Sequence, residues 1–406
     1  MSADLPAHAG LEGGPIYLDY NATTPVDPRV IEAMLPYLTT YFGNPSSSHH
    51  YAEQPRRALA TARRQVARLI GAAPDEIVFT GSGSEADALA IHGAVVAHRR
   101  PSEVQVITQM TEHPAVLEAC RALHRRFGTE VTYLPVGRDG RVDPQDLAGA
   151  ITPRTALVSI MAANNETGVL QPIEELARVA RQRGALFHAD AAQAVGKIPI
   201  DVGRLGVDLL SVVGHKMYAP KVVGALYVRS GVLLEPVVHG GGQERGLRAG
   251  TENVALAVGL GAAADLARHE LADDGPRRLQ ELRDLLYRRL NDHLPGRVRL
   301  TGHPAQRLPG TLHISIIGVH GDDLLAATPA IAAATGSACH AHSREPSPVL
   351  LAMPQDRDQA LSALRLSLGR WTTRPDVERA AEAIAMTAHR LLAPTAARDG
   401  PETHGG

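Results

Sequence analysis

Residues 185–228 have the sequence ALFHADAAQAVGKIPIDVGRLGVDLLSVVGHKMYAPKVVGALYV. The segment holds three short apolar runs, ALFHAD, DLLSVV and GALYV, separated by stretches that contain glycine or proline. Short apolar runs bounded by turn residues are typical of buried β-strands. The segment therefore predicts three buried strands.

The same pattern begins at residue 76, where four earlier apolar runs are separated mostly by amphipathic segments: EIVFT, VQVIT, VTYLPV and TALVSIM. Strands that alternate with helices indicate a mainly parallel sheet covered by helices. A helix over 55–72 precedes them, and helical spacing puts one apolar stripe toward the sheet, made of Leu59, Ala62, Val66, Leu69 and Ile70. We therefore expect an α/β fold with a mainly parallel, seven-stranded sheet.

The rest of the chain suggests a second, smaller α+β part. A helical region over 251–294 leads into the apolar runs RVRL, TLHISIIG and ALRLSLG, and an amphipathic helix closes the fold. Both ends of the chain are small, polar and rich in Gly and Pro, which is typical of mobile tails. The expected organisation is a tail over 1–14, a large domain over 15–265, a small domain over 266–394 and a tail over 395–406. An alternative left open is that the first residues of the large domain pack with the small one.

Composition excludes several classes of protein. A chain of 406 residues with 44% hydrophobic residues can bury a large core, and a net charge of −2 argues against nucleic-acid or membrane binding. No apolar run is long enough to cross a bilayer and no secretory leader is evident. The only two cysteines, Cys120 and Cys339, cannot form a disulfide framework. We expect a cytoplasmic protein.

In a parallel sheet, ligands bind beyond the carboxyl ends of the strands. The run EIVFT is followed by GSGSEADALAI, whose helix N-terminus and hydroxyls at Ser82 and Ser84 suit a phosphate. An ordinary helix cap is the alternative, because such turns often only cap helices. The Gly-Lys-Ser/Thr sequence of a P-loop is absent.

Two further strand ends carry reactive side chains. Asp190 ends an apolar strand, with Gln193 nearby, and would suit either a protonated pyridine nitrogen or the N-cap of the next segment. Lys216, in GHKMYAP, either extends its amine to water or has the lowered pKa that a Schiff base requires. A phosphate site, a pyridinium partner and an imine-forming lysine are together the requirements of pyridoxal 5'-phosphate.

The sequence also resembles the cysteine desulfurases, in the class V aminotransferase-like group of fold-type I pyridoxal-phosphate enzymes. The resemblance extends from residue 16 to residue 392. Eight ordered motifs carry it: YLDYNATTPVDPRV, GNPSSSH, EHPAVLE, NNETGVLQP, FHADAAQAVGK, GHKMYAPKVVGALYV, GGGQERGLRAGTEN and LRLSLGRWTT. It implies conversion of L-cysteine to L-alanine with transfer of sulfur to the enzyme.

The resemblance implies a role for each cofactor-ring residue. Lys216 would form the Schiff base with the cofactor and Asp190 would pair with its pyridine nitrogen. His113 would stack on the ring and assist proton transfer. Gln193 and Asn165 would contact the ring hydroxyl side.

Phosphate and substrate sites follow from the same resemblance. The implied phosphate ligands are Gly83, Ser84, His215 and, from a neighbouring subunit, Thr251. A ligand from a second subunit implies a homodimer. Arg365 would bind the substrate carboxylate through its two-pronged guanidinium, with Asn21 nearby. From its sequence context alone, Arg365 would be interpreted as a surface arginine on a strand.

Cys339 lies in GSACHAHS, which matches the desulfurase loop that carries the nucleophilic cysteine. It would attack the substrate sulfur, become a persulfide and deliver its sulfur to an acceptor protein. A zinc site of Cys339, His340 and His342 is a minor alternative, because the three lie too close together for a structural site, so no metal is expected. Cys120 is expected to be a small core residue on a helix.

A selenocysteine lyase, acting on L-selenocysteine, is the second hypothesis. Desulfurases usually have a phosphate-binding serine three residues before the lysine, where this chain has Val213, and an apolar residue there is closer to the lyases. Ala219 and Val222 also replace usual glycines, so the turn is expected to adopt positive φ less readily. A non-catalytic cofactor-binding scaffold is the third hypothesis, and the presence of a nucleophile argues against it.

Overall fold

The computed structural model describes residues 8–336 and 345–393. Its centre is a seven-stranded sheet in which strand β8 alone runs in the direction opposite to the other six strands. Across the sheet the strands are β2 (Ile77–Thr80), β8 (Gly224–Val228), β7 (Leu209–Val213), β6 (Leu186–Asp190), β5 (Thr155–Ser159), β3 (Gln105–Gln109) and β4 (Glu130–Leu134). The mainly parallel α/β sheet expected from the sequence is confirmed.

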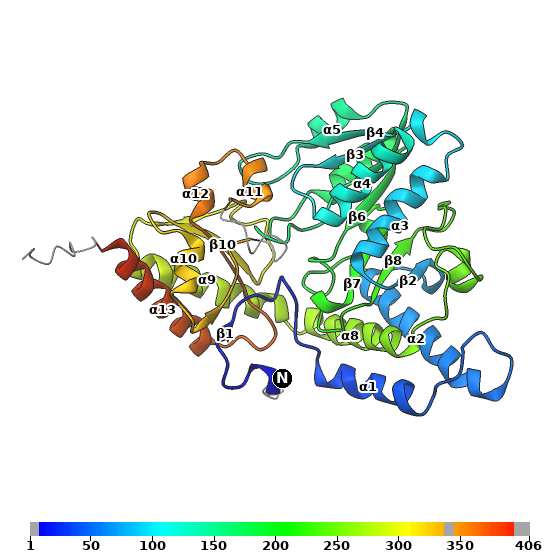
Figure 1. Cartoon of the computed structure of the whole chain (residues 1–406), viewed down its shortest axis with the longest axis horizontal. Coiled ribbons are helices and arrows are strands. Elements are labelled where there is room, and N and C mark those ends of the chain that lie inside the picture. The colour runs from blue at the N-terminus through cyan, green and yellow to red at the C-terminus, as the bar shows by residue number, and fades with distance from the viewer. Residues whose placement is uncertain (1–7, 337–344, 394–406) are drawn as a thin grey trace, which may run out of the picture.

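Helices cover both faces of this sheet (Figure 1). One face packs against α3 (Gly83–Val96) and α4 (Pro114–Phe127), in a core that contains the buried Cys120. The other face carries α1 (Pro28–Thr39), α2 (Glu53–Ile70), α5 (Pro144–Ala150), α6 (Ile173–Gln182), α7 (Val202–Leu205) and α8 (Val254–Ala272). The apolar stripe expected on α2 is buried in this second core.

A smaller unit lies beside the large sheet (Figure 1). Its antiparallel sheet has the order β12 (Ala363–Ser367), β10 (Thr311–Ile316), β9 (Val298–Leu300), and its apolar face packs against α9 (Gly275–His293) and α13 (Arg374–Leu392). The N-terminal strand β1 (Ile16–Tyr17) pairs with β11 (Ile331–Ala332), so it lies with this unit. Helix α8 continues to Ala272, through the boundary expected at residue 265.

The remaining elements are short. They are α10 (Gly321–Ala326), α11 (Pro348–Ala352), α12 (Arg357–Leu361) and the 3-10 turns η1 (Ala9–Leu11), η2 (His50–Ala52), η3 (Pro74–Glu76), η4 (Pro101–Glu103), η5 (Gly214–Lys216) and η6 (Gln243–Gly246). Within the segment expected to be a tail, His8 hydrogen-bonds the Val26 carbonyl and its ring lies edge-on to Trp371. No helix in the described parts of the chain is long and apolar enough to span a membrane.

Candidate active site

A cavity of about 350 Å³ lies beyond the carboxyl ends of the parallel strands, closed on one side by β12 of the small unit. Ten of the residues assigned from the sequence line it: Asn21, Gly83, Ser84, His113, Asn165, Asp190, Gln193, His215, Lys216 and Arg365. These residues come from segments far apart in the chain. The fold therefore brings together nearly all the expected site.

One end of the pocket is the N-terminus of α3. Ser82 is its N-cap and accepts a hydrogen bond from Glu85 N, while Gly83 and Ser84 begin the helix. The first N–H groups of a helix have no partner within the helix, so this end attracts an anion. His215 also lines this pocket, and its Nδ1 lies 3.1 Å from Thr23 Oγ1. Burial and the neighbouring Lys216 lower the pKa of His215 to about 4, a shift that a bound phosphate would oppose.

A carboxylate is placed deeper in the pocket, at the end of β6. Asp190 accepts a hydrogen bond from Ala192 N at 2.9 Å, and its second oxygen has no hydrogen-bond partner among the described residues. Burial raises the pKa of Asp190, whereas His113 and Lys216 act in the opposite direction. A cationic N–H in the pocket would satisfy the second oxygen and stabilise the ionised acid.

His113 is the N-cap of α4. Its Nδ1 accepts a hydrogen bond from Ala115 N at 3.1 Å, so the neutral ring carries its proton on Nε2. Burial lowers the pKa of His113, which favours this neutral form. Any proton that His113 donates or accepts in the pocket must therefore pass through Nε2.

Lys216 lies in the turn η5, between β7 and β8. Its Nζ donates to the carbonyl oxygens of Asn21 and Ala22, at 2.7 Å each. These contacts hold the amine at the wall of the pocket, against the N-terminal segment that contains Asn21 and Ala22. The position fits an amine that forms a covalent bond with a bound aldehyde.

Arg365 contradicts the surface position that its local sequence suggested. It is 1% exposed, on β12, and its Nη2 lies 2.7 Å from Asp19 Oδ1. Its Nη1 donates to the Asn165 carbonyl at 3.2 Å, and its buried Nε has no hydrogen-bond partner among the residues that the structure describes. A buried guanidinium with an unused N–H can bind a carboxylate strongly.

The structure shows what Val213 contacts in place of the usual serine. Val213 packs on the phosphate turn, because a Cβ added to Gly83 would lie 2.4 Å from Val213 Cγ2. Ser211 is fully buried, its hydroxyl contacts His188 Nε2 at 3.0 Å, and it does not line the pocket. Ser211 therefore does not replace the hydroxyl missing at residue 213.

The glycine-poor turn adopts positive φ even without its usual glycines. Val222 adopts φ of +63° despite its branched side chain, and Tyr218 adopts +67°. Contacts outside the turn hold this geometry: Tyr218 N donates to Thr24 Oγ1, and the Arg370 guanidinium stacks on the Tyr218 ring.

Sequence reasoning missed three residues of this site. Asp87 lines the pocket, and burial beside Asp190 raises its pKa well above the usual range. Asp19 pairs with Arg365. Lys197 hydrogen-bonds two of the assigned residues, Gln193 and Asn21. Lys197 and Asp19 do stand inside the recognised motifs, but only contacts across the chain reveal their partners.

Two expected residues are not placed at the pocket by the structure. Thr251 is exposed, in the segment before α8, and does not line the pocket of its own chain. Cys339 lies outside the described residues, as do His340 and His342. Within the described residues, no cluster of three or more His, Cys, Asp or Glu side chains could hold a metal.

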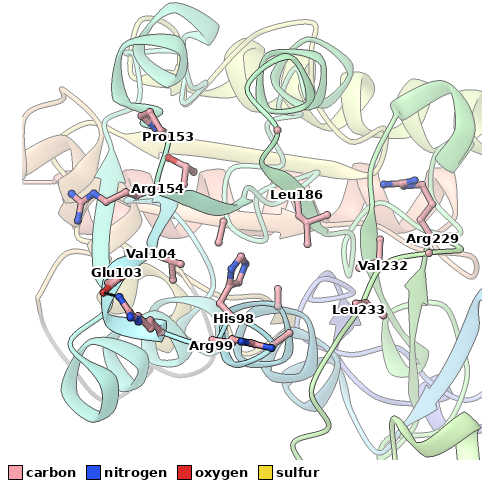
Figure 2. Close-up of a pocket in the computed structure, with 17 residues that line it drawn as sticks. His98, Arg99, Glu103, Val104, Pro153, Arg154, Leu186, Arg229, Val232 and Leu233 are labelled. Atoms are coloured by element: carbon pink, nitrogen blue, oxygen red, sulfur yellow. Dashed lines mark hydrogen bonds and ion pairs between the residues drawn. The ribbon is translucent and has the colours of Figure 1, made fainter.

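A larger cleft, of about 800 Å³, lies at the opposite ends of the strands, near the starts of β5 and β6 (Figure 2). Arg154 and Arg229 lie on opposite sides of it, and each is paired with an acid, Glu130 and Asp208 respectively. Arg100 pairs with Glu103 within the cleft. Most charged side chains of this cleft therefore form ion pairs with adjacent residues. The reactive side chains that point toward one ligand site lie in the smaller pocket instead.

The smaller pocket fits pyridoxal phosphate. It combines a helix N-terminus for a phosphate, an unsatisfied carboxylate oxygen at Asp190 for a pyridine nitrogen and the Lys216 amine for an aldehyde. The Asn165 side-chain amide also lines it and has no hydrogen-bond partner in the described residues. Each functional group of the cofactor thus meets a residue of matching chemistry.

Comparison with known proteins agrees with this chemistry. Residues 16–380 match the family described as aminotransferase class-V. The chain is 46% identical over 382 residues to a protein of Mus musculus named cysteine desulfurase. The aligned region covers 93% of this chain and 82% of that protein. Two solved structures also align over most of their length. A NifS-like protein aligns with TM-score 0.85, 35% identity and coverage of 93% of this chain and 100% of that one. A second, described as SspA in complex with cysteine, aligns with TM-score 0.78, 36% identity and coverage of 88% and 99%. The chain therefore belongs to the cysteine desulfurase group of the class-V aminotransferase family and is a pyridoxal-phosphate-dependent enzyme.

Proposed function

We propose that the chain converts L-cysteine to L-alanine and transfers the sulfur to Cys339. The observation that carries this proposal is the meeting of Lys216, Asp190 and the buried Arg365 in one pocket. The relatives named cysteine desulfurase and the structural neighbour described with cysteine support the choice of substrate.

Bound pyridoxal phosphate would supply an aldehyde for amines and a ring that withdraws electrons from the substrate Cα. Arg365 binds the substrate carboxylate, with the Asn21 amide nearby. Lys216 would hold the cofactor between turnovers, and its amine, once released, would move the Cα proton. Asp190 would keep the pyridine nitrogen protonated, and His113 would present its Nε2 proton to the ring side of the pocket.

Sulfur transfer uses the thiol of Cys339. Its thiolate attacks the substrate sulfur, an S–S bond forms, the Cβ–S bond breaks, and the electron pair of that bond remains with the substrate carbon. That carbon takes up a proton on the way to L-alanine. In total, L-cysteine and the enzyme thiol give L-alanine and the enzyme persulfide, so no external oxidant or reductant is required.

Three features of the assembly belong to the same proposal. The enzyme acts as a homodimer in which Thr251 of one subunit completes the phosphate site of the other. A separate acceptor protein removes the persulfide sulfur. A free thiol at Cys339 fits a reducing compartment such as the cytoplasm.

Selenocysteine lyase activity is the second candidate, because the apolar Val213 packs on the phosphate turn where desulfurases usually have a serine. A parallel assay of L-cysteine and L-selenocysteine, with wild type and Cys339→Ala, separates the two functions. Alanine should form from L-cysteine and be lost in Cys339→Ala. If the variant keeps cysteine turnover and wild type strongly prefers selenocysteine, the lyase assignment replaces ours. If neither amino acid gives alanine although the cofactor is bound, the chain is a scaffold.

A further inference from the structure

Lysine is rare in this chain, and all of it lies in one segment. The chain has 41 lysines and arginines, of which only Lys197, Lys216 and Lys221 are lysines. Lys216 and Lys221 line the cofactor pocket, and Lys197 contacts two residues that do. Arginine serves as the cation everywhere else, so these positions need a chemistry that arginine does not supply.

The Lys197 amine is held by amide oxygens. Its Nζ donates to Gln193 Oε1 at 2.6 Å and to Asn21 Oδ1 at 3.1 Å. No carboxylate pairs with it in the described residues, and the other cations that act on it are Lys216 and Arg365. The residue keeps some exposed surface, but burial of the amine lowers its pKa well below the usual value. Even a neutral amine retains the two N–H groups that these contacts require.

These two contacts determine which way each amide faces. Because Lys197 supplies donors, Gln193 must turn its oxygen toward it, and Gln193 Nε2 then donates to the Asn21 carbonyl at 2.9 Å. Asn21 likewise turns its Nδ2 toward Thr311 Oγ1, at 3.0 Å, and the Asn165 carbonyl. The Asn21 carbonyl also accepts from Lys216 Nζ. Lys197 thus completes a hydrogen-bond network. The network joins Gln193 on the cofactor-ring side, Asn21 on the substrate side and Lys216, the lysine expected to bind the cofactor.

The network leaves one N–H of Gln193 Nε2 for the pocket, because the other is used by the Asn21 carbonyl. We propose that Lys197 is a positioning residue, which fixes Gln193 as a hydrogen-bond donor to the ring hydroxyl of the cofactor. The inference rests on the proposed role of Gln193. Without Lys197 the amide can turn over and place its oxygen against the ring oxygen, where it repels the ionised form.

The signature is spectroscopic. A donor to the ring oxygen stabilises its ionised form, so loss of the donor should raise the pH midpoint of the cofactor's absorption band. For the holoenzyme of Lys197→Met we expect a midpoint raised by about one pH unit and cofactor bound about tenfold less tightly. The melting temperature of the cofactor-free protein should not fall, because methionine fills the same space without a desolvated amine.

A double-mutant cycle tests whether Lys197 acts through Gln193. Gln193→Met alone should raise the midpoint, and Lys197→Met added to it should cause little further shift. The matched control is Gln105→Met, which removes a buried amide hydrogen-bonded to Thr132 and Thr155 near the start of β3. It should lower the melting temperature with and without cofactor and leave the absorption titration unchanged.

Two results overturn the inference. One is a Lys197→Met titration that matches wild type, and the other is a pair of shifts from Lys197→Met and Gln193→Met that simply add. Failure of the underlying site assignment is distinguishable: without a bound cofactor wild type would form no pH-sensitive band, and without the Gln193 contact Gln193→Met would leave the midpoint unchanged. A purely structural role would lower the melting temperature of cofactor-free Lys197→Met and leave the midpoint of its holoenzyme unchanged.

Discussion

Val213 presents methyl groups where the phosphate turn could use a hydroxyl. Its Cγ2 packs directly on Gly83, so the phosphate ligands expected nearby are the helix N-terminus of α3, the Ser84 hydroxyl and the His215 imidazole. Ser211, the nearest hydroxyl on β7, already contacts His188. The cofactor should therefore be bound with one hydrogen bond fewer than this pocket can support.

Val213→Thr keeps the shape of valine and adds one hydroxyl at the phosphate turn. A hydrogen bond to a charged group contributes about 1.5–3 kcal/mol, so the cofactor should bind about tenfold more tightly or better. Fluorescence titration of the cofactor-free protein with pyridoxal phosphate measures the change. Val213→Ala, which adds no donor, is the control, and an equal gain in both variants would refute the explanation.

The turn between β7 and β8 is the element that presents Lys216. It accepts two residues with positive φ, Tyr218 and Val222, and Tyr218 is fixed through its ring by Arg370 and through its N–H by Thr24. Arg370 in turn pairs with Asp27 and Glu270, so α1, α8 and the small unit all support the turn. This support from three elements explains how the turn keeps its geometry without its usual glycines.

Val222→Gly should stabilise the protein. Val222 is 71% exposed, so its side chain buries little, and a branched residue at positive φ is strained by about 1–3 kcal/mol. Subtracting the greater flexibility of glycine in the unfolded chain leaves a gain of about 1 kcal/mol. Denaturant unfolding of the cofactor-free protein measures it. Val237→Gly, an exposed valine without positive φ, should destabilise, and a loss of stability in both variants would show that Val222 is not strained.

At the scale of the whole molecule, the small sheet closes the pocket with its polar face. His313, on β10, lies opposite Arg365 on β12, and this face meets Asn21 and Asn165 of other segments. Both ring nitrogens of His313 are buried without hydrogen-bond partners in the described part of the chain, and burial lowers the pKa of His313 to about 3. The protonated, charged form of His313 is therefore strongly disfavoured in the folded protein.

Acid should destabilise the fold through His313. Its folded pKa lies below the value of 6.5 expected when unfolded, so the unfolded chain gains a proton first and stability falls as the pH drops below 6.5. Between pH 7 and pH 5 this one group should cost about 2 kcal/mol. As the pH falls from 7 to 5, the stability of His313→Leu should rise by that amount relative to wild type. Denaturant unfolding of both proteins at each pH measures this difference. His50→Leu, an exposed site, should show the wild-type pH dependence, and a His313→Leu curve parallel to wild type would exclude the effect.

Strand periodicity and strand-end chemistry are local signals, so they allowed the fold class, the apolar stripe of α2 and a few pocket residues, such as Asp190 and Lys216, to be predicted. The other pocket residues were expected only from the resemblance to the cysteine desulfurases. Local signals did not predict the burial of Arg365, the Asp19 pair or the Lys197 contacts. These depend on β12 and the N-terminal segment reaching the large sheet from opposite ends of the chain. The positive φ of Val222 was missed for a similar reason, since distant elements hold it.

The central claim is that the Lys216 amine carries the cofactor. Borohydride treatment of the cofactor-loaded protein, followed by peptide mass mapping, tests it directly, because the chain offers only three lysine side chains. We expect a pyridoxyl group on Lys216 alone and none on the same peptide in Lys216→Ala. A label confined to Lys197 or Lys221, or no label on any lysine, would contradict the account.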